Sequence, residues 1–286
     1  MQRPPAPQTP PVYRTTDVYA RVVAASFLAL IVTAMAPASA QTYTGPTPAP
    51  RSTDAATLAA QGRAREVRER FVRGVAAEEH GDWSTAASEF TRVVALDPPE
   101  PKGSSARYDL ALAQTHLGRD DAAVALLEEA LHRDPRFAAA AANLVAVQLR
   151  RGDLAGARRA ADQYLAFAPD SVLARYGRGL AALRAGDLVT ARGDFRVLID
   201  ADPSYATAHY DLAVVELRAG RDDAARTELE HALALAPNYA RASFALGTVL
   251  VRAGRRADAR VAFDRCAHDA EDPALRALAI DLRDRL

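Results

Sequence analysis

The 286-residue chain contains one cysteine and one tryptophan, and aromatic residues make up only 6% of it. The single Cys266 forms no intrachain disulfide, and no cysteine cluster is available to hold a metal ion. The chain has no excess charge either, because 36 basic side chains balance 36 acidic ones. A net charge of zero provides no overall attraction to nucleic acid or to an anionic membrane surface.

Sequence motifs of enzymes and cofactor sites are missing as well. The chain has no Gly-rich phosphate loop, no Gly-x-Ser-x-Gly turn and no pair of histidines spaced as in a metalloprotease. Two adjacent acids, Glu78 and Glu79, and His80 do cluster within residues 77–82, which is typical of the solvated end of a helix. The six histidines are scattered along the chain: His80, His116, His132, His209, His231 and His268. We therefore predict a protein that is not an enzyme and that uses no metal or cofactor.

The first forty residues have the composition of a secretory signal. Arginines precede an uncharged stretch of 15 residues at 22–36, and Ala38 and Ala40 follow in the small-x-small pattern that signal peptidase reads. We predict a signal peptide at residues 1–40, cleaved after Ala40, which places the mature protein in the periplasm or outside the cell without membrane insertion. The alternative is anchoring to the inner membrane by uncleaved residues 22–36, although a membrane span needs about 20 apolar residues.

Residues 41–53 are rich in proline and threonine and have little to bury. Such a composition favours an extended, solvated linker. The folded region is therefore expected to begin at residue 54.

A spacing of 34 residues recurs along the rest of the chain. Glycines return once after 37 residues and then four times after 34: Gly81, Gly118, Gly152, Gly186, Gly220 and Gly254. Prolines keep the same spacings: Pro98, Pro135, Pro169, Pro203 and Pro237. An alanine follows each glycine after five residues: Ala86, Ala123, Ala157, Ala191, Ala225 and Ala259. Periods of this length indicate a stacked array of similar units, here six units over residues 54–272.

Each unit also has a leucine or arginine followed by a small residue before the glycine, as Leu212 and Ala213 precede Gly220. In this combination of markers the chain resembles the tetratricopeptide repeat family, in an exported bacterial form. The resemblance implies an all-α fold, an α-solenoid of six helix-turn-helix repeats with a C-terminal capping helix at residues 273–286. Arg178 replaces the leucine in the fourth unit, which predicts looser packing there.

The fourth unit shows how each marker acts physically. Gly186 is expected to end the first helix in the left-handed backbone region, and Asp187 to cap the second helix. Ala191 and Phe195 are four residues apart and share one face of that helix. Pro203 ends it, because proline excludes helical geometry at the residue before it. The other acids of the stretch are interpreted as solvent-exposed.

Numbering each unit so that its glycine is position 15 places positions 5, 9, 12 and 13 on one face of the first helix. In tetratricopeptide proteins this face lines a concave groove that holds peptide segments of partners. The resemblance therefore implies a partner-binding groove of these residues: Tyr108, Tyr176, Leu180, Leu183, Arg184, Tyr210, Val214, Arg218, Phe244, Arg252 and Arg150. Two structural explanations stay open, because position-5 aromatics also pack within such arrays and an arginine near a helix end complements the helix dipole without a ligand.

The resulting hypothesis is a scaffold or adaptor of the bacterial cell envelope that binds a protein or peptide segment, with the arginines favouring an acidic one. The alternative is a structural subunit of an envelope assembly or secretion complex that acts through its convex face or by self-association. The sequence names neither the partner nor the oligomeric state.

Overall fold

The computed structural model describes residues 55–286, which form thirteen α-helices and no β-strand. The signal peptide and linker predicted for residues 1–53 lie outside the described residues. No helix in the described range combines the length and apolar character that a membrane crossing requires. The helices are α2 (Ala55–Glu79), α3 (Trp83–Ala95), α4 (Lys102–His116), α5 (Asp120–Arg133), α6 (Ala138–Arg151), α7 (Leu154–Phe167), α8 (Val172–Ala185), α9 (Leu188–Ala201), α10 (Ala206–Arg218), α11 (Asp222–Leu235), α12 (Ala240–Arg252), α13 (Arg256–Asp269) and α14 (Pro273–Asp284).

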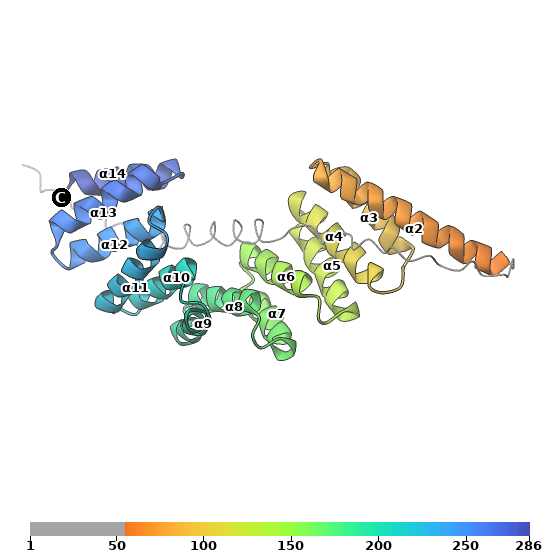
Figure 1. Cartoon of the computed structure of the whole chain (residues 1–286), viewed down its shortest axis with the longest axis horizontal. Helices are drawn as coiled ribbons and strands as arrows, with labels where there is room; N and C mark the ends of the chain where they lie inside the picture. The colour runs from red at the N-terminus through yellow and green to blue at the C-terminus, as the bar shows by residue number, and fades with distance from the viewer. Residues whose placement is uncertain (1–54) are drawn as a thin grey trace, which may run out of the picture.

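Consecutive helices pair into six helix-turn-helix repeats, numbered here from repeat 1 (α2–α3) to repeat 6 (α12–α13), and α14 follows the last one. Each repeat packs against the next, so contacts run between neighbours along the array. The repeats describe an arch with α2 at one end and α14 at the other (Figure 1). First helices such as α6 and α8 lie toward the inside of the arch, and second helices such as α7 and α9 lie toward the outside (Figure 1). The predicted α-solenoid with its C-terminal capping helix is confirmed.

The turn inside each repeat is made by the glycine at position 15. Gly186 has φ of 83°, in the left-handed region that only glycine enters without steric cost, and the other five repeat glycines also have positive φ. The carboxylate of Asp187 then accepts a hydrogen bond from the backbone N–H of Thr190 at 3.1 Å and caps α9. Helix α9 ends at Ala201, two residues before Pro203. The expected turn, cap and stop are all present.

The two helices of each repeat meet where position 8 of the first faces position 24 of the second, and the two side chains vary together in size. Glycine faces phenylalanine in repeats 1, 4 and 6, alanine faces leucine in repeats 2 and 5, and valine faces alanine in repeat 3. The pairs are Gly74/Phe90, Ala111/Leu127, Val145/Ala161, Gly179/Phe195, Ala213/Leu229 and Gly247/Phe263. A Cβ placed on Gly179 would lie 2.9 Å from Cε1 of Phe195, so the ring occupies the space that the glycine leaves. Close packing thus holds the helix pair together with three different residue combinations.

Arginine at position 7 does not loosen repeat 4, contrary to the expectation from the sequence. Arg178 donates hydrogen bonds to both carboxylate oxygens of Asp194, at 2.6 and 2.9 Å, and another to Asp162 at 2.9 Å. Asp194 is buried, so its interpretation as a solvent-exposed acid was wrong. Repeat 1 has the same arrangement, with Arg73 paired to Glu89 at 3.2 Å. Arginine can replace leucine at this position because it neutralises the acid that the second helix places there.

Additional helical residues are present at both ends of the array. Helix α2 has 25 residues, whereas α4, the longest of the other first helices, has 15. At the other end, α14 buries Leu275 and Ala279 in a cluster with Phe244 and Phe263 of repeat 6. Its remaining residues leave a polar outer face, as the open end of a stacked array requires.

The size match between positions 8 and 24 predicts the outcome of a double-mutant cycle in repeat 4. Gly179→Ala is expected to lower the free energy of unfolding by about 1–2 kcal/mol, because the new methyl group overlaps the Phe195 ring. Phe195→Leu alone is expected to cost about 1 kcal/mol through the space it leaves. The double variant recreates the alanine–leucine pair of repeats 2 and 5, and should recover about 1–2 kcal/mol relative to the sum of the single changes. Urea unfolding followed by circular dichroism measures all three.

Gly193→Ala is the matched control, since Gly193 lies mid-helix in α9 with no atom within 4 Å of an added Cβ. It should raise stability by about 0.5–1 kcal/mol through helix propensity. Equal effects of Gly179→Ala and Gly193→Ala would contradict the size match.

Candidate functional site

The apolar residues predicted to form the floor of a groove are buried in the structure. None of the seven is more than 8% exposed, and six of them belong to the main hydrophobic core, while Phe244 lies in the core beneath α14. They are Tyr108, Tyr176, Leu180, Leu183, Tyr210, Val214 and Phe244. These side chains pack in the core and expose little surface. That they bind a partner stays a prediction.

Two of the position-5 tyrosines connect one repeat to the next through their hydroxyl groups. The Tyr176 hydroxyl donates to the Asp211 carboxylate at 2.6 Å, and the Tyr108 hydroxyl accepts from the Asn143 side-chain amide at 3.0 Å. Asp211 and Asn143 both occupy position 6 of the following repeat. Burial raises the pKa of Asp211 to about 7. The aromatic positions therefore set the contact between first helices of neighbouring repeats.

The arginines at position 13 make contacts across repeat junctions. Arg184 donates to the backbone carbonyl of Leu149 at 2.9 Å, and Arg218 donates in the same way to that of Leu183 at 2.6 Å. Each carbonyl lies in the last turn of the preceding repeat's first helix, where it also accepts a hydrogen bond from the backbone N–H of the C-cap glycine at 3.3 Å. Burial lowers the pKa of both guanidinium groups. These two arginines cap the helix beside them.

The residue at position 17 of the preceding repeat accounts for which contact forms. Where position 17 is aspartate, the arginine pairs with it instead: Arg150 with Asp120 at 2.9 Å, and Arg252 with Asp222 at 2.9 Å. Where position 17 is leucine, as at the Arg184 and Arg218 junctions, the arginine reaches the carbonyl. At the first junction, His116 replaces arginine and stacks on a tryptophan at position 17, with ring centroids 3.7 Å apart. All five described junctions therefore use position 13, and the predicted line of arginines has a structural role.

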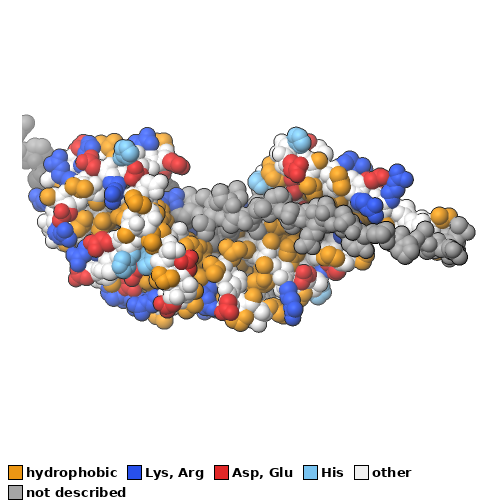
Figure 2. All heavy atoms as spheres, in the orientation of Figure 1, with side chains coloured by type: hydrophobic (Ala, Val, Ile, Leu, Met, Phe, Trp, Pro, Cys, Tyr) orange, Lys and Arg blue, Asp and Glu red, His pale blue; other side chains and the backbone are white. Residues whose placement is uncertain are grey.

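The outer surface has no single-sign charge patch on the face that Figure 2 presents. Acidic and basic side chains are interspersed there, with hydrophobic side chains between them (Figure 2). This distribution agrees with the balanced composition of the chain.

A pair of acids lies at the junction of repeats 1 and 2. Burial raises the pKa of Glu78 to about 7, and burial together with the nearby Glu78 raises the pKa of Asp109. Buried Oε1 of Glu78 has no hydrogen-bond partner within the described part of the chain. Residues 77–82 were interpreted as a solvated helix end, and for Glu78 that interpretation was wrong.

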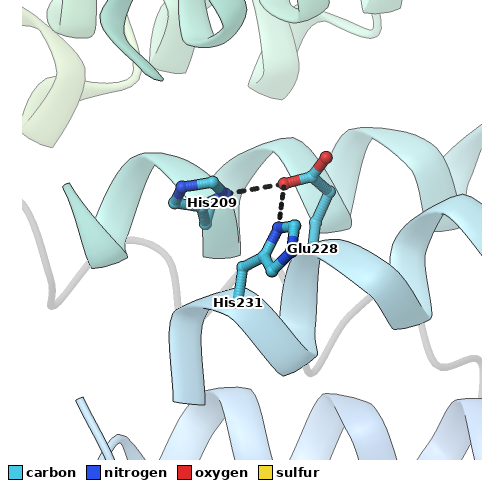
Figure 3. Close-up of side chains that lie close together, drawn as sticks. All are labelled: His209, Glu228 and His231. Atoms are coloured by element: carbon cyan, nitrogen blue, oxygen red, sulfur yellow. Dashed lines mark hydrogen bonds and ion pairs between the residues drawn. The ribbon is translucent and has the colours of Figure 1, made fainter. Parts of the chain in front are cut away.

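Three potential metal ligands meet in repeat 5, where no metal site was expected. His209 comes from α10, and Glu228 and His231 come from α11, with their ligand atoms all within 4.8 Å of one another (Figure 3). His209 Nδ1 lies 2.7 Å from Glu228 Oε2, and His231 Nδ1 lies 3.9 Å from the same oxygen. The sequence signal was weak, since only Glu228 and His231 share a helix, three residues apart. His209 is brought to them by the turn between the two helices.

Comparison with known proteins places the repeats in a described family. A family model described as a tetratricopeptide repeat matches at residues 71–136, 121–172, 142–206 and 210–275, and a second model with the same description matches at residues 182–234. The search of curated proteins found no matching sequence.

Solved structures with a similar fold include pilF of Pseudomonas aeruginosa, with a TM-score of 0.60 at 14% identity over 77% of this chain and 99% of that one. A tetratricopeptide repeat protein from Parabacteroides merdae gives 0.57 at 14% identity, again over 77% of this chain and 99% of that one. YrrB, described as a tetratricopeptide protein with an unusual peptide-binding site, gives 0.52 at 17% identity over 68% of this chain and all of its own. At these identities the likeness shows the fold alone.

The junction contacts predict unequal costs of removing two position-13 arginines. Arg184→Met removes a charged donor from a helix-end carbonyl in a half-buried setting, which should cost about 1.5–3 kcal/mol. Arg252→Met removes an ion pair whose arginine is 46% exposed, which should cost about 0–1 kcal/mol. Urea midpoints of the two variants measure the difference. Equal losses would show that the carbonyl contact contributes no more than the exposed pair.

Proposed function

The chain belongs to the tetratricopeptide repeat family, and from this premise we propose that it is a non-enzymatic scaffold or adaptor of the bacterial cell envelope. Tetratricopeptide arrays are protein–protein interaction modules, generally without catalytic activity of their own. The partner of this chain is a protein segment that lies along the inside of the arch.

The observation that supports this surface is the arrangement of the first helices. They follow one another along the inside of the arch (Figure 1), so the first helices line one continuous face rather than six separate ones. At position 12 of repeat 6, Val251 is 40% exposed, an apolar side chain on the face that the family uses for peptides. YrrB, with the same fold, has a peptide-binding site.

The preference for an acidic partner rests on Arg150 and Arg252. Both are paired to aspartates that remain partly exposed, so a carboxylate of a partner can exchange with Asp120 or Asp222. Arg184 and Arg218 hold carbonyls within the array and contribute less to such recognition. The acidic partner is therefore proposed to contact the array toward repeats 3 and 6.

The envelope setting rests on residues 1–40, which have the three parts of a secretory signal. Export would bring the array to the periplasm, where its partner would be an envelope protein.

A second candidate function uses the outside of the arch. Val189 on α9 is 85% exposed and Val261 on α13 is 69% exposed, both on second helices. Apolar side chains exposed there favour a structural subunit that packs through its convex face or with a second copy of itself.

Site-specific photo-crosslinking distinguishes the two surfaces. A photoreactive residue replacing Val251 reports on the inside of the arch, and one replacing Val189 reports on the outside. Both side chains are exposed, so neither replacement disturbs the core. We expect a crosslinked partner in the envelope fraction from position 251 and none from position 189. Crosslinks from position 189 alone would favour the convex-face function.

Export with cleavage of the signal peptide predicts a specific mass for the mature protein. Protein purified from the native envelope fraction should begin at Gln41, because the small-x-small pattern ends at Ala40. Intact-mass spectrometry measures this directly. A mass that includes Met1 would show that residues 22–36 are retained as an anchor.

A further inference from the structure

We propose that His209, Glu228 and His231 form a binding site for one divalent transition-metal ion of the zinc class. The three side chains converge from the two helices of repeat 5, and their ligand atoms lie within 4.8 Å of one another (Figure 3). Two imidazoles and a carboxylate are a ligand set that zinc uses in proteins.

The hydrogen bonds of His209 orient its ring for ligation. Its Nε2 lies 3.1 Å from the backbone carbonyl of Pro203, an acceptor, so Nε2 carries a proton and donates it there. In the neutral ring Nδ1 then has a lone pair, and it faces Glu228 Oε2 at 2.7 Å. A cation coordinated by both atoms would stabilise their proximity, once they separate to the distance that coordination requires. Metal-bound histidines commonly have this geometry, with the second nitrogen donating to a carbonyl.

Two other repeats carry an acid at the position of Glu228, position 23, and show which side chains neutralise it there. Position 23 is also acidic in repeats 1 and 4, where arginines at positions 4 and 7 neutralise it. Glu89 lies 3.3 Å from Arg70 and 3.2 Å from Arg73, and Asp194 lies 3.7 Å from Arg175 and 2.6 Å from Arg178.

Repeat 5 keeps the acid but replaces both arginines. Position 4 is His209 and position 7 is Leu212, while His231 approaches from position 26. A guanidinium is always charged, whereas an imidazole can be neutral and ligate a metal ion. A bound cation uses all three side chains.

The exposure of the cluster suits an ion that enters from solvent. The His209 side chain is 8% exposed, Glu228 23% and His231 58%. The buried ligand is thus fixed, and the outermost one can rotate. Tetrahedral coordination at bond lengths of about 2.0–2.2 Å places ligand atoms about 3.3–3.5 Å apart, which requires small movements from the present separations. Water completes the coordination on the exposed side.

The metal would join the two helices of repeat 5. Because the ligands come from α10 and α11, the ion binds the folded repeat and not the separated helices. Metal binding should therefore raise the thermal stability of the chain.

Isothermal titration of the purified full chain with ZnCl2 tests the site. We expect one zinc ion per chain, and at least a 100-fold loss of affinity in His231→Ala and in Glu228→Gln, since even outer-shell changes cost 10–100-fold. His268→Gln is the matched control, because His268 is exposed and pairs with Asp269 outside the cluster. It should bind zinc as the wild type does. Zinc should raise the melting temperature of the wild type and of the control only.

Cobalt supplies a second measurement that does not depend on stability. Co2+ bound by two imidazoles and a carboxylate gives visible absorption bands that the His231→Ala variant should lack. His231 is mostly exposed, so the variant should match the metal-free wild type in circular dichroism. Absence of one-to-one zinc binding, or equal affinity in His231→Ala, Glu228→Gln and the control, would overturn the proposal.

Discussion

The packing of position 8 against position 24 is the contact on which the rest of the array depends. It fixes how closely the two helices of a repeat approach each other. The residues at the two positions are glycine and phenylalanine, alanine and leucine, or valine and alanine. In five of the six repeats a small residue on the first helix faces a large one on the second, and in repeat 3 valine on the first helix faces alanine on the second. The interface between neighbouring repeats can recur only because every repeat presents a similar shape. Close packing makes this constraint strict, since an added methyl group at Gly179 would overlap the Phe195 ring.

The junctions between repeats tolerate more chemical variety than the repeats themselves. Position 13 uses a stacked histidine, an arginine–aspartate pair or an arginine–carbonyl hydrogen bond to reach the same neighbour. Each solution connects the end of one first helix to the preceding repeat. The arginines that resemble a ligand-binding line thus position the inner surface. The proposed preference for an acidic partner therefore rests on Arg150 and Arg252, which pair with partly exposed aspartates.

Position 23 shows how a repeat acquires chemistry without changing its fold. The acid lies between the two helices in repeats 1, 4 and 5, and its neutralising partners differ among them. In repeats 1 and 4, two arginines neutralise the acid. Two imidazoles in repeat 5 leave the carboxylate available to an ion, which is the basis of the proposed metal site. The three acids occupy the same position of the repeat, so the difference among them lies in the neighbouring side chains.

The repeat period, the turns and the helix ends could be predicted from the sequence, because they depend on local backbone chemistry. Gly186, Asp187 and Pro203 act through their own φ angles and hydrogen bonds, and each was found where its residue type indicated. The residues that share one face of each first helix, at positions 5, 9, 12 and 13, could be predicted as well. How exposed these residues are could not be predicted, because their burial depends on the neighbouring repeats.

The contacts between helices were decided only by the tertiary structure. The partners of Asp194, Glu78 and the position-13 arginines lie on other helices, and a single helix pattern does not contain them. His209 and Glu228 are 19 residues apart and meet because one turn folds α11 back along α10. The sequence by itself determined the repeating unit, since that unit follows from short-range sterics and capping. The clusters of charged and ligating side chains follow from the packing of helices within and between repeats, which brings residues distant in the sequence within contact distance.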